Sequence, residues 1–179
     1  MDIDTRKREL RQQVKQEKKR VPIEQCLADA ESLFAKLESM PEFIKADHVM
    51  CYWSLPDEVN TCNFIERWYQ KKKIYLPKVV GSDLEIMLYS GRNSMVLGKF
   101  NIYEPCGDAL HDLGILNMVI VPGVAFSEDG YRLGRGGGYY DRFLPKVKQA
   151  FKVGVAYPFQ IKTYIPSEMH DIKMDRVVC

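Results

Sequence analysis

Apolar residues recur along the chain in two patterns, one typical of helices and the other of strands. After Val21-Pro22 they return every three or four positions, which is the spacing of a helix that turns one face toward a core. The residues expected on that face are Ile23, Leu27, Ala30, Phe34 and Leu37. Residues 60–73 follow the same spacing, with Asn60 or Thr61 as the N-cap. We therefore predict two amphipathic helices in this part of the chain.

Short apolar runs predict the strands. Residues 118–122 (MVIVP) are apolar almost without interruption, which is typical of a strand buried on both faces of a parallel sheet. Four further runs predict strands at residues 48–54, 74–77, 84–90 and 152–157. Strands that alternate with helices indicate an α/β fold with a mainly parallel sheet. The length of 179 residues suits a single domain.

Two other segments predict helices of a less regular kind. Residues 143–151 (FLPKVKQAF) have helical potential with a kink or break at Pro145. Residues 4–20 are rich in strong helix formers but carry only a thin apolar stripe. Lys7 and Arg11 lie four positions apart and therefore share a face of this helix. That face is either solvated or directed at an anionic ligand, and the pattern alone favours the solvated alternative.

Composition and charge exclude several classes of protein. Hydrophobic residues make up 46% of the chain, and 26 basic residues nearly balance 24 acidic ones. A dedicated nucleic-acid binder usually has a strong basic excess, so we expect no nucleic-acid partner. No apolar run is long enough to cross a bilayer, and the charged N-terminal segment does not resemble a signal peptide. The five scattered cysteines form no CxxC pair, which argues against disulfides and structural zinc. We expect a cytoplasmic protein with no membrane association and no obligatory protein partner.

The most distinctive stretch is GRGGGYYDR, residues 134–142. Disordered Arg–Gly segments occur as repeats in polar surroundings, whereas this single copy lies between a buried strand and a segment with helical potential. A glycine loop in that position brings backbone N–H groups close to an anion, and Arg132 and Arg135 can add bidentate phosphate contacts. The stretch matches neither GxxxxGK[ST] nor GxGxxG. Residues alone thus predict a phosphate or nucleotide site of an uncommon kind.

Residues 121–144 (VPGVAFSEDGYRLGRGGGYYDRFL) resemble the signature of the 5-formyltetrahydrofolate cyclo-ligase family. Four shorter segments agree with the same family in the same order: Lys-x-x-Leu-Arg at 7–11, LPDEVNT at 55–61, GKFNIYEP at 98–105 and HDIKMD at 170–175. The resemblance covers nearly the whole chain. It implies a single three-layer α/β domain over residues 1–179, similar to the sugar-phosphate isomerases and CoA transferases.

The resemblance also implies an activity. Enzymes of this family convert 5-formyltetrahydrofolate to 5,10-methenyltetrahydrofolate and hydrolyse ATP to ADP and phosphate with Mg²⁺. ATP phosphorylates the formyl oxygen, and the resulting iminophosphate is attacked by the neighbouring amine. The resemblance leaves open whether the folate substrate is polyglutamylated.

The family motifs transfer residue by residue onto this chain. Arg135 is the implied catalytic residue, because it can stabilise the transferring phosphoryl group. The ATP contacts implied are Lys7, Arg11, Arg132, Gly134, Arg135, Gly136, Gly137, Gly138, Tyr139 and Tyr140. The folate contacts implied are Trp53, Glu58, Arg135, Gly136, Gly137, Gly138 and Tyr139. The metal contacts implied are Asp141 and Asp171, with Asp175 as a rival to the latter.

Alternative roles, including purely structural ones, stay open for several of these residues. Trp53 is either a ring that stacks on the pterin or a core residue, and Tyr103 is a weaker candidate for the same pocket. His170 either orients the metal segment or is purely structural. For the whole protein the alternatives are an RNA- or nucleotide-binding module, an ATP-independent enzyme of a related fold, and a family member without folate activity.

Overall fold

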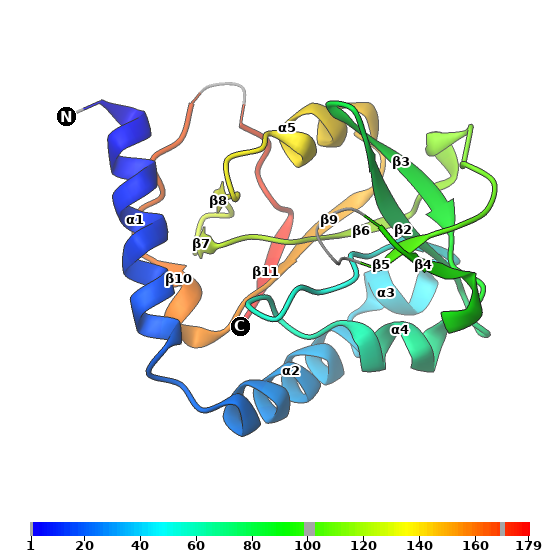
Figure 1. The fold of residues 1–179 in the computed structure, drawn as a ribbon, viewed down its shortest axis with the longest axis horizontal. Helices are drawn as coiled ribbons and strands as arrows, with labels where there is room; N and C mark the ends of the chain where they lie inside the picture. Colours follow the sequence, from blue (N-terminus) through cyan, green and yellow to red (C-terminus); the bar gives the residue numbers. More distant parts are fainter. Residues whose placement is uncertain (1, 99–102, 169–170) are drawn as a thin grey trace.

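A mainly parallel sheet forms the centre of the protein. The structure, a computed structural model, describes residues 2–98, 103–168 and 171–179 (Figure 1). The six strands lie in the order β11-β9-β6-β1-β2-β3, and only β2 and β3 are antiparallel. Their bounds are β1 His48–Met50, β2 Lys73–Val80, β3 Asp83–Leu88, β6 Met118–Val121, β9 Phe151–Val155 and β11 Arg176–Val178. The predicted α/β class with a mainly parallel sheet is confirmed.

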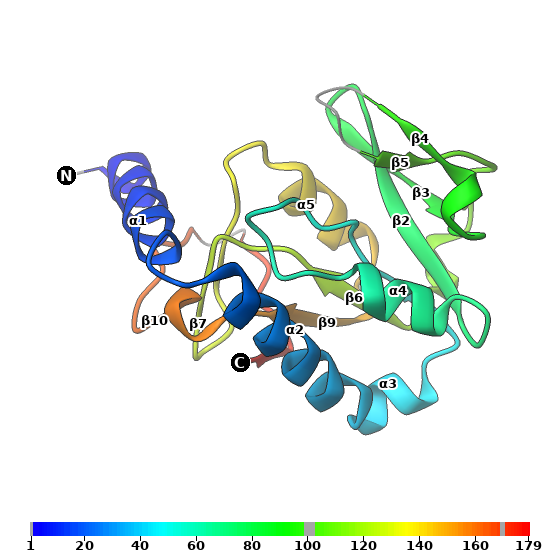
Figure 2. The ribbon, with the colours of Figure 1, turned by 60° about the horizontal axis from the view of Figure 1, so that its bottom comes forward.

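Helices cover both faces of this sheet. Figure 2 shows α2, α3 and α4 on one side of β6 and β9, and α5 on the other. These helices are α2 Ile23–Glu38, α3 Pro41–Lys45, α4 Cys62–Trp68 and α5 Tyr139–Phe143. Alternate residues of β6 point to different cores: Ile120 packs under α2 and α4, whereas Val119 packs under α5. The uninterrupted apolar run of this strand therefore serves two cores, as predicted.

A smaller sheet lies beside the main one. It joins β10 (Ile161–Lys162), β7 (Ala125–Ser127) and β8 (Arg132–Leu133), and a separate hairpin pairs β4 (Met95–Leu97) with β5 (Tyr103–Pro105). Helix α1 (Ile3–Lys18) runs along the small sheet (Figure 1). The cluster beneath it is small and contains the buried residues Val14, Ala125, Leu133 and Ile165.

Three expectations drawn from the hydrophobic pattern are wrong. The strand predicted at 48–54 ends at Met50: the amide of Cys51 still donates to Tyr75 O on β2, but the amide of Ser54 donates to Thr61 Oγ1 within its own loop. The helix predicted at 143–151 is absent: α5 ends at Phe143, a 3₁₀ turn follows over Leu144–Lys146, and β9 begins at Phe151. Pro145 lies in that turn and cannot donate the hydrogen bond that a continuing helix needs.

The third wrong expectation concerns the first turns of α2. Ile23 and Leu27 keep 75% and 47% of their surface exposed, although they follow the same helical spacing as the buried Ala30, Phe34 and Leu37.

No helix in the described residues is long and apolar enough to span a membrane.

Candidate functional site

The site lies where the order of the parallel strands reverses. The chain passes from β1 to β2 on one side, while β6 joins β1 on the other and is followed by β9. Loops that leave the carboxyl ends of two such strands separate and open a crevice. Here the segments after β1 and β6 border a cavity of about 280 Å³. The topology therefore places a binding site at residues 51–61 and 122–141.

The glycine stretch forms one wall of this cavity. It connects β8 to α5, and every residue from Gly134 to Asp141 lines the cavity. Gly136 and Gly138 have φ angles of 101° and 69°, a backbone conformation that glycine adopts without strain. Arg142 fixes the loop by donating from Nη2 to Gly137 O at 3.0 Å and to Ser82 O at 2.6 Å.

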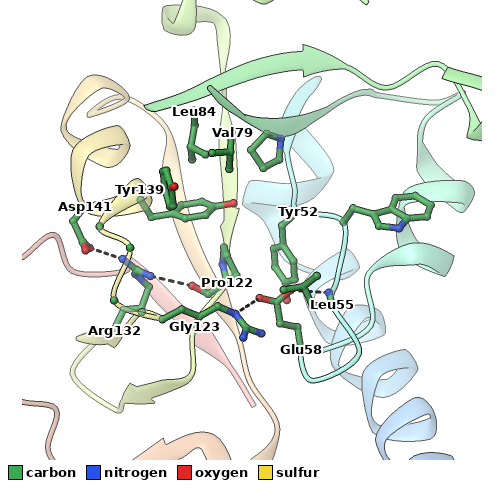
Figure 3. Close-up of a pocket in the computed structure, with 18 of the residues that line it drawn as sticks. Tyr52, Leu55, Glu58, Val79, Leu84, Pro122, Gly123, Arg132, Tyr139 and Asp141 are labelled. Atoms are coloured by element: carbon green, nitrogen blue, oxygen red, sulfur yellow. Dashed lines mark hydrogen bonds and ion pairs between the residues drawn. The ribbon is translucent and has the colours of Figure 1, made fainter. Parts of the chain in front are cut away.

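The opposite wall is the irregular segment after β1, which is held by its own side chains. Thr61 Oγ1 donates to Tyr52 O at 2.6 Å, and the amide of Thr61 donates to Ser54 Oγ at 3.1 Å. Glu58 Oε2 accepts the amide hydrogen of Leu55 at 2.9 Å, which closes a tight turn. The Glu58 side chain is only 12% exposed. The turn thus presents a shielded carboxylate to the cavity (Figure 3).

Arg135 bridges the two walls. Its Nε lies 3.1 Å from Glu58 Oε1, and its Nη2 lies 2.6 Å from Asp57 Oδ1. Burial alone would lower the pKa of Arg135, but the hydrogen bond to Asp57 and the charges of Glu58 and Asp57 outweigh it and raise the pKa. The predicted catalytic arginine and the predicted folate carboxylate therefore meet directly.

The remaining walls are apolar and aromatic. Val79 and Leu84, which are paired across β2 and β3, lie above the cavity in Figure 3. Trp53 lines the cavity and also packs on the core, with its ring centroid 5.9 Å from that of Tyr89, so its core role is observed and its stacking on a pterin stays a prediction. Tyr103 also lines the cavity and is 53% exposed.

Tyr140 contributes an unusual polar group to the same cavity. Its hydroxyl is buried without a hydrogen-bond partner among the described residues, and burial raises its pKa well above the ordinary value. A buried hydroxyl without a partner is costly, so a polar ligand atom would satisfy it. Arg132 lies over the Tyr140 ring, 5.7 Å from its centroid.

Helix α1 adds cationic side chains to the glycine loop. Arg11 Nε donates to Gly134 O at 2.8 Å, and Lys18 Nζ donates to Pro56 O at 3.1 Å. A second cavity, of about 220 Å³, lies between α1 and these loops and includes Arg11, Lys15, Lys18 and Arg135 in its lining. Burial lowers the pKa of both Arg11 and Lys18. For Arg11, the solvated-face interpretation is therefore wrong.

The three candidate metal carboxylates have different surroundings. Asp141 lines the main cavity and forms an ion pair with Arg132 (Figure 3). Asp171 lies outside the lining of that cavity, 3.6 Å from Lys7 Nζ, and accepts the amide hydrogen of Glu168. Asp175 accepts the amide hydrogen of Lys152 at 2.7 Å and so joins β9 to the segment before β11. This structural bond makes Asp175 the weaker candidate.

No group of three or more metal-ligating side chains occurs in the described part of the chain. A Mg²⁺ ion bound partly through substrate phosphates needs only one or two carboxylates, which Asp141 and Asp171 could supply. His170, the proposed orienting residue, lies outside the described residues.

Several residues of the site were not identified from the sequence. They are Tyr52, Leu55, Asp57, Pro77, Val79, Leu84, Pro122 and Gly123. The signal available for the strand members was period-two alternation, since Pro77 and Val79 share the face of β2 that carries Tyr75. Nothing in the sequence pairs Asp57 with Arg135, which lies 78 positions away.

Comparisons with known proteins place the chain in one family. The model of the 5-formyltetrahydrofolate cyclo-ligase family matches residues 3–179. The 5-formyltetrahydrofolate cyclo-ligase of Escherichia coli K12 is 31% identical, with 92% of this chain and 95% of that protein aligned. The mouse enzyme of the same name is 29% identical, with 98% and 94% aligned.

Solved structures agree as well. The NMR structure of Aquifex aeolicus 5,10-methenyltetrahydrofolate synthetase has a TM-score of 0.86 and 36% sequence identity, over 96% of this chain and 88% of that one. A Mycoplasma pneumoniae 5,10-methenyltetrahydrofolate synthetase, at 21% identity and a TM-score of 0.75, shares the fold over 96% of this chain and 97% of its own. The chain therefore belongs to the 5-formyltetrahydrofolate cyclo-ligase family, a family of ligases.

Proposed function

We propose that the protein catalyses the ATP- and Mg²⁺-dependent conversion of 5-formyltetrahydrofolate to 5,10-methenyltetrahydrofolate, with release of ADP and phosphate. The observation that carries the proposal is the bridge formed by Arg135 between the glycine loop and Glu58. It brings the residue expected to stabilise a phosphoryl group into contact with the residue expected to hold the pterin. Both substrates must meet at such a point if one is to phosphorylate the other.

The chemistry requires positioning more than covalent participation by the protein. A formamide oxygen is a poor leaving group, and its phosphorylation gives an iminophosphate from which phosphate can depart. The neighbouring amine of the same folate then attacks the activated carbon and closes the ring. The protein must align the formyl oxygen with the terminal phosphate of ATP and neutralise the charge that develops there.

The two substrates use overlapping sets of residues. ATP is assigned to Lys7, Arg11, Arg132, the loop from Gly134 to Gly138, Tyr139 and Tyr140. Folate is assigned to Trp53, Glu58 and the loop from Arg135 to Tyr139.

The chemistry of the pterin explains the choice of Glu58. A carboxylate can accept two adjacent N–H groups of the pterin ring, and the apolar wall formed by Val79 and Leu84 suits the ring faces. The buried Tyr140 hydroxyl offers one more hydrogen bond to a ligand in the same cavity.

The carboxylates of Asp141 and Asp171 are the proposed protein contacts of Mg²⁺. When bound there, the ion would neutralise part of the charge of the phosphates. Arg132 and Lys7 form ion pairs with Asp141 and Asp171, respectively. These cations would also reach the phosphates if the carboxylates turned to the metal.

The test is the absorbance of the methenyl product in a mixture of protein, 5-formyltetrahydrofolate, ATP and Mg²⁺. We expect a rise that requires both ATP and Mg²⁺. Arg135→Ala should lower kcat by about 100- to 1,000-fold, which is typical for loss of a group that stabilises transition-state charge. Arg176→Ala, on the exposed end of β11, is the control and should retain full activity. A folded protein that gives no product under any of these conditions would refute the proposed reaction.

A further inference from the structure

The two contacts of Arg135 differ in their surroundings. Glu58 is 12% exposed, whereas Asp57 is 58% exposed and the Arg135 side chain is 45% exposed. A shielded carboxylate needs a partner, because loss of hydration penalises its charge. The exposed pair with Asp57 is easily exchanged, since water solvates both charges well when they separate. The ion pair of Arg135 with Glu58 is thus the stronger of its two contacts, and the pair with Asp57 is the weaker.

The proposed pterin contact conflicts with this arrangement. Glu58 Oε1 is occupied by Arg135 Nε, and Oε2 by the amide of Leu55. Donors on the pterin ring that approach both oxygens would compete with the guanidinium at Oε1, although a carboxylate oxygen can accept more than one hydrogen bond. As the shielded carboxylate gains this new partner, Arg135 loses part of the stronger of its two contacts. Occupation of Glu58 by folate and release of Arg135 are therefore coupled.

We propose that Asp57 is a positioning residue that, together with Glu58, holds Arg135 away from the phosphates until folate occupies Glu58. The inference rests on the proposed function, since it assigns an order to the contacts of the same two substrates. With Glu58 occupied, only the exposed contact with Asp57 opposes the movement of Arg135 toward the phosphates. Folate and ATP should consequently strengthen each other's binding by the same factor.

The Asp57 carboxylate belongs to a turn that is fixed on both sides. Lys18 Nζ donates to Pro56 O at 3.1 Å, and the amide of Glu58 donates to Leu55 O at 3.0 Å. Burial would raise the pKa of Asp57, but the hydrogen bond from Arg135, the charges of Arg135 and Lys18 and a backbone hydrogen bond together outweigh it and lower the pKa. Asp57 is therefore a charged anchor on a turn held by these hydrogen bonds, and Arg135 is the partner that would move.

Calorimetric titration with a non-hydrolysable ATP analogue and Mg²⁺, with and without 5-formyltetrahydrofolate, tests this inference. In the wild type we expect folate to tighten binding of the analogue. Asp57→Asn should bind the analogue alone more tightly, by up to about fivefold, because an exposed ion pair no longer competes for Arg135. The gain from folate should shrink in this variant, because two contacts that orient one guanidinium support each other. Asp57→Glu should restore part of the wild-type behaviour.

The matched control is Asp83→Asn, because Asp83 forms an ion pair of similar exposure with Lys146 on the other side of the glycine loop. It should leave both titrations unchanged. Equal affinity of wild type and Asp57→Asn for the analogue alone would overturn the role of Asp57, even in an enzyme that turns over normally. The titration without folate needs no reaction, so this failure differs from failure of the proposed activity, which appears as a wild type that forms no methenyl product.

Discussion

Helices α1 and α2 each contain 16 residues, yet they are attached to the protein in opposite ways. Helix α2 buries four apolar side chains, including Phe34, which stacks on Phe64 with 4.6 Å between ring centroids. Helix α1 buries only Val14. Apart from Leu10, which packs partly buried on the same cluster, its other attachments described here are polar, and three of them, from Lys7, Arg11 and Lys18, reach loops around the proposed site.

This difference distinguishes the apolar contacts that stabilise the fold from the polar contacts that form the proposed site. Apolar burial supplies most of the free energy of folding, whereas exposed polar contacts supply little of it. Substitutions in α2 should therefore change stability without changing chemistry. Substitutions on the polar face of α1 near the proposed site should change ligand binding with little change in stability.

The largest expected effect is on the α2 side of the comparison. Leu37→Ala should lower the free energy of unfolding by about 2–5 kcal/mol, because Leu37 is fully buried. Leu27→Ala makes the same chemical change on the same helix at a position that is 47% exposed, and should cost no more than about 0.5 kcal/mol. Urea unfolding measures both. Equal losses in the free energy of unfolding would mean that the helical spacing of a leucine, rather than its observed burial, determines how much it stabilises the protein.

An intermediate effect is expected for Arg11 on α1. Arg11→Ala removes a charged group that lines the second cavity and fixes Gly134 O, so the KM for ATP should rise by about 10- to 100-fold. The melting temperature should stay close to that of the wild type. Arg8→Ala, an exposed position on the same helix, is the control. A large loss of stability with an unchanged KM would reverse the assignment of α1 to the site.

The smallest effect concerns the pH dependence of the attachment of α1. Glu17 Oε2 lies 2.6 Å from Lys162 Nζ, and this hydrogen bond lowers the pKa of Glu17 from its ordinary value of 4.5. A lowered folded-state pKa gives a stabilisation that is full above about pH 4.5 and is lost as the pH falls through the folded-state value.

Glu17→Gln should accordingly cost at most about 1 kcal/mol near pH 7, and the difference from wild type should disappear in acid. Unfolding curves recorded from pH 7 to pH 3 would show this convergence. Glu9→Gln, exposed on the same helix, should show no such trend. A difference that persists unchanged at low pH would mean that the pair does not support α1 through its charge.

The features that were predicted best from the sequence are those that depend on residues close together along the chain. The apolar run of β6 indicated a strand between two cores, and the glycine stretch indicated the loop that borders the cavity. Helical rhythm failed at Ile23 because α2 extends beyond the surface it covers, and rhythm carries no information on where that surface ends.

Contacts between distant residues could not be derived in this way. The pairing of Asp57 with Arg135 depends on the meeting of two loops at the strands β1 and β6. The apolar wall formed by Val79 and Leu84 depends on a hairpin whose sequence does not show which face points toward the loops. Resemblance to a family located the charged residues, but it did not indicate which of them bind one another.

The contacts of α1 also have a consequence for the time course of folding. Lys7, Arg11 and Glu17 bind partners that lie 161, 123 and 145 positions away along the chain. Closing loops of that length is slow compared with forming local structure, so α1 should dock only after the rest of the chain has been synthesised and packed. The partners of Lys7 and Glu17 lie beyond β9 in the chain, so the contacts of α1, and with them the proposed nucleotide site, would be complete only on a nearly finished molecule.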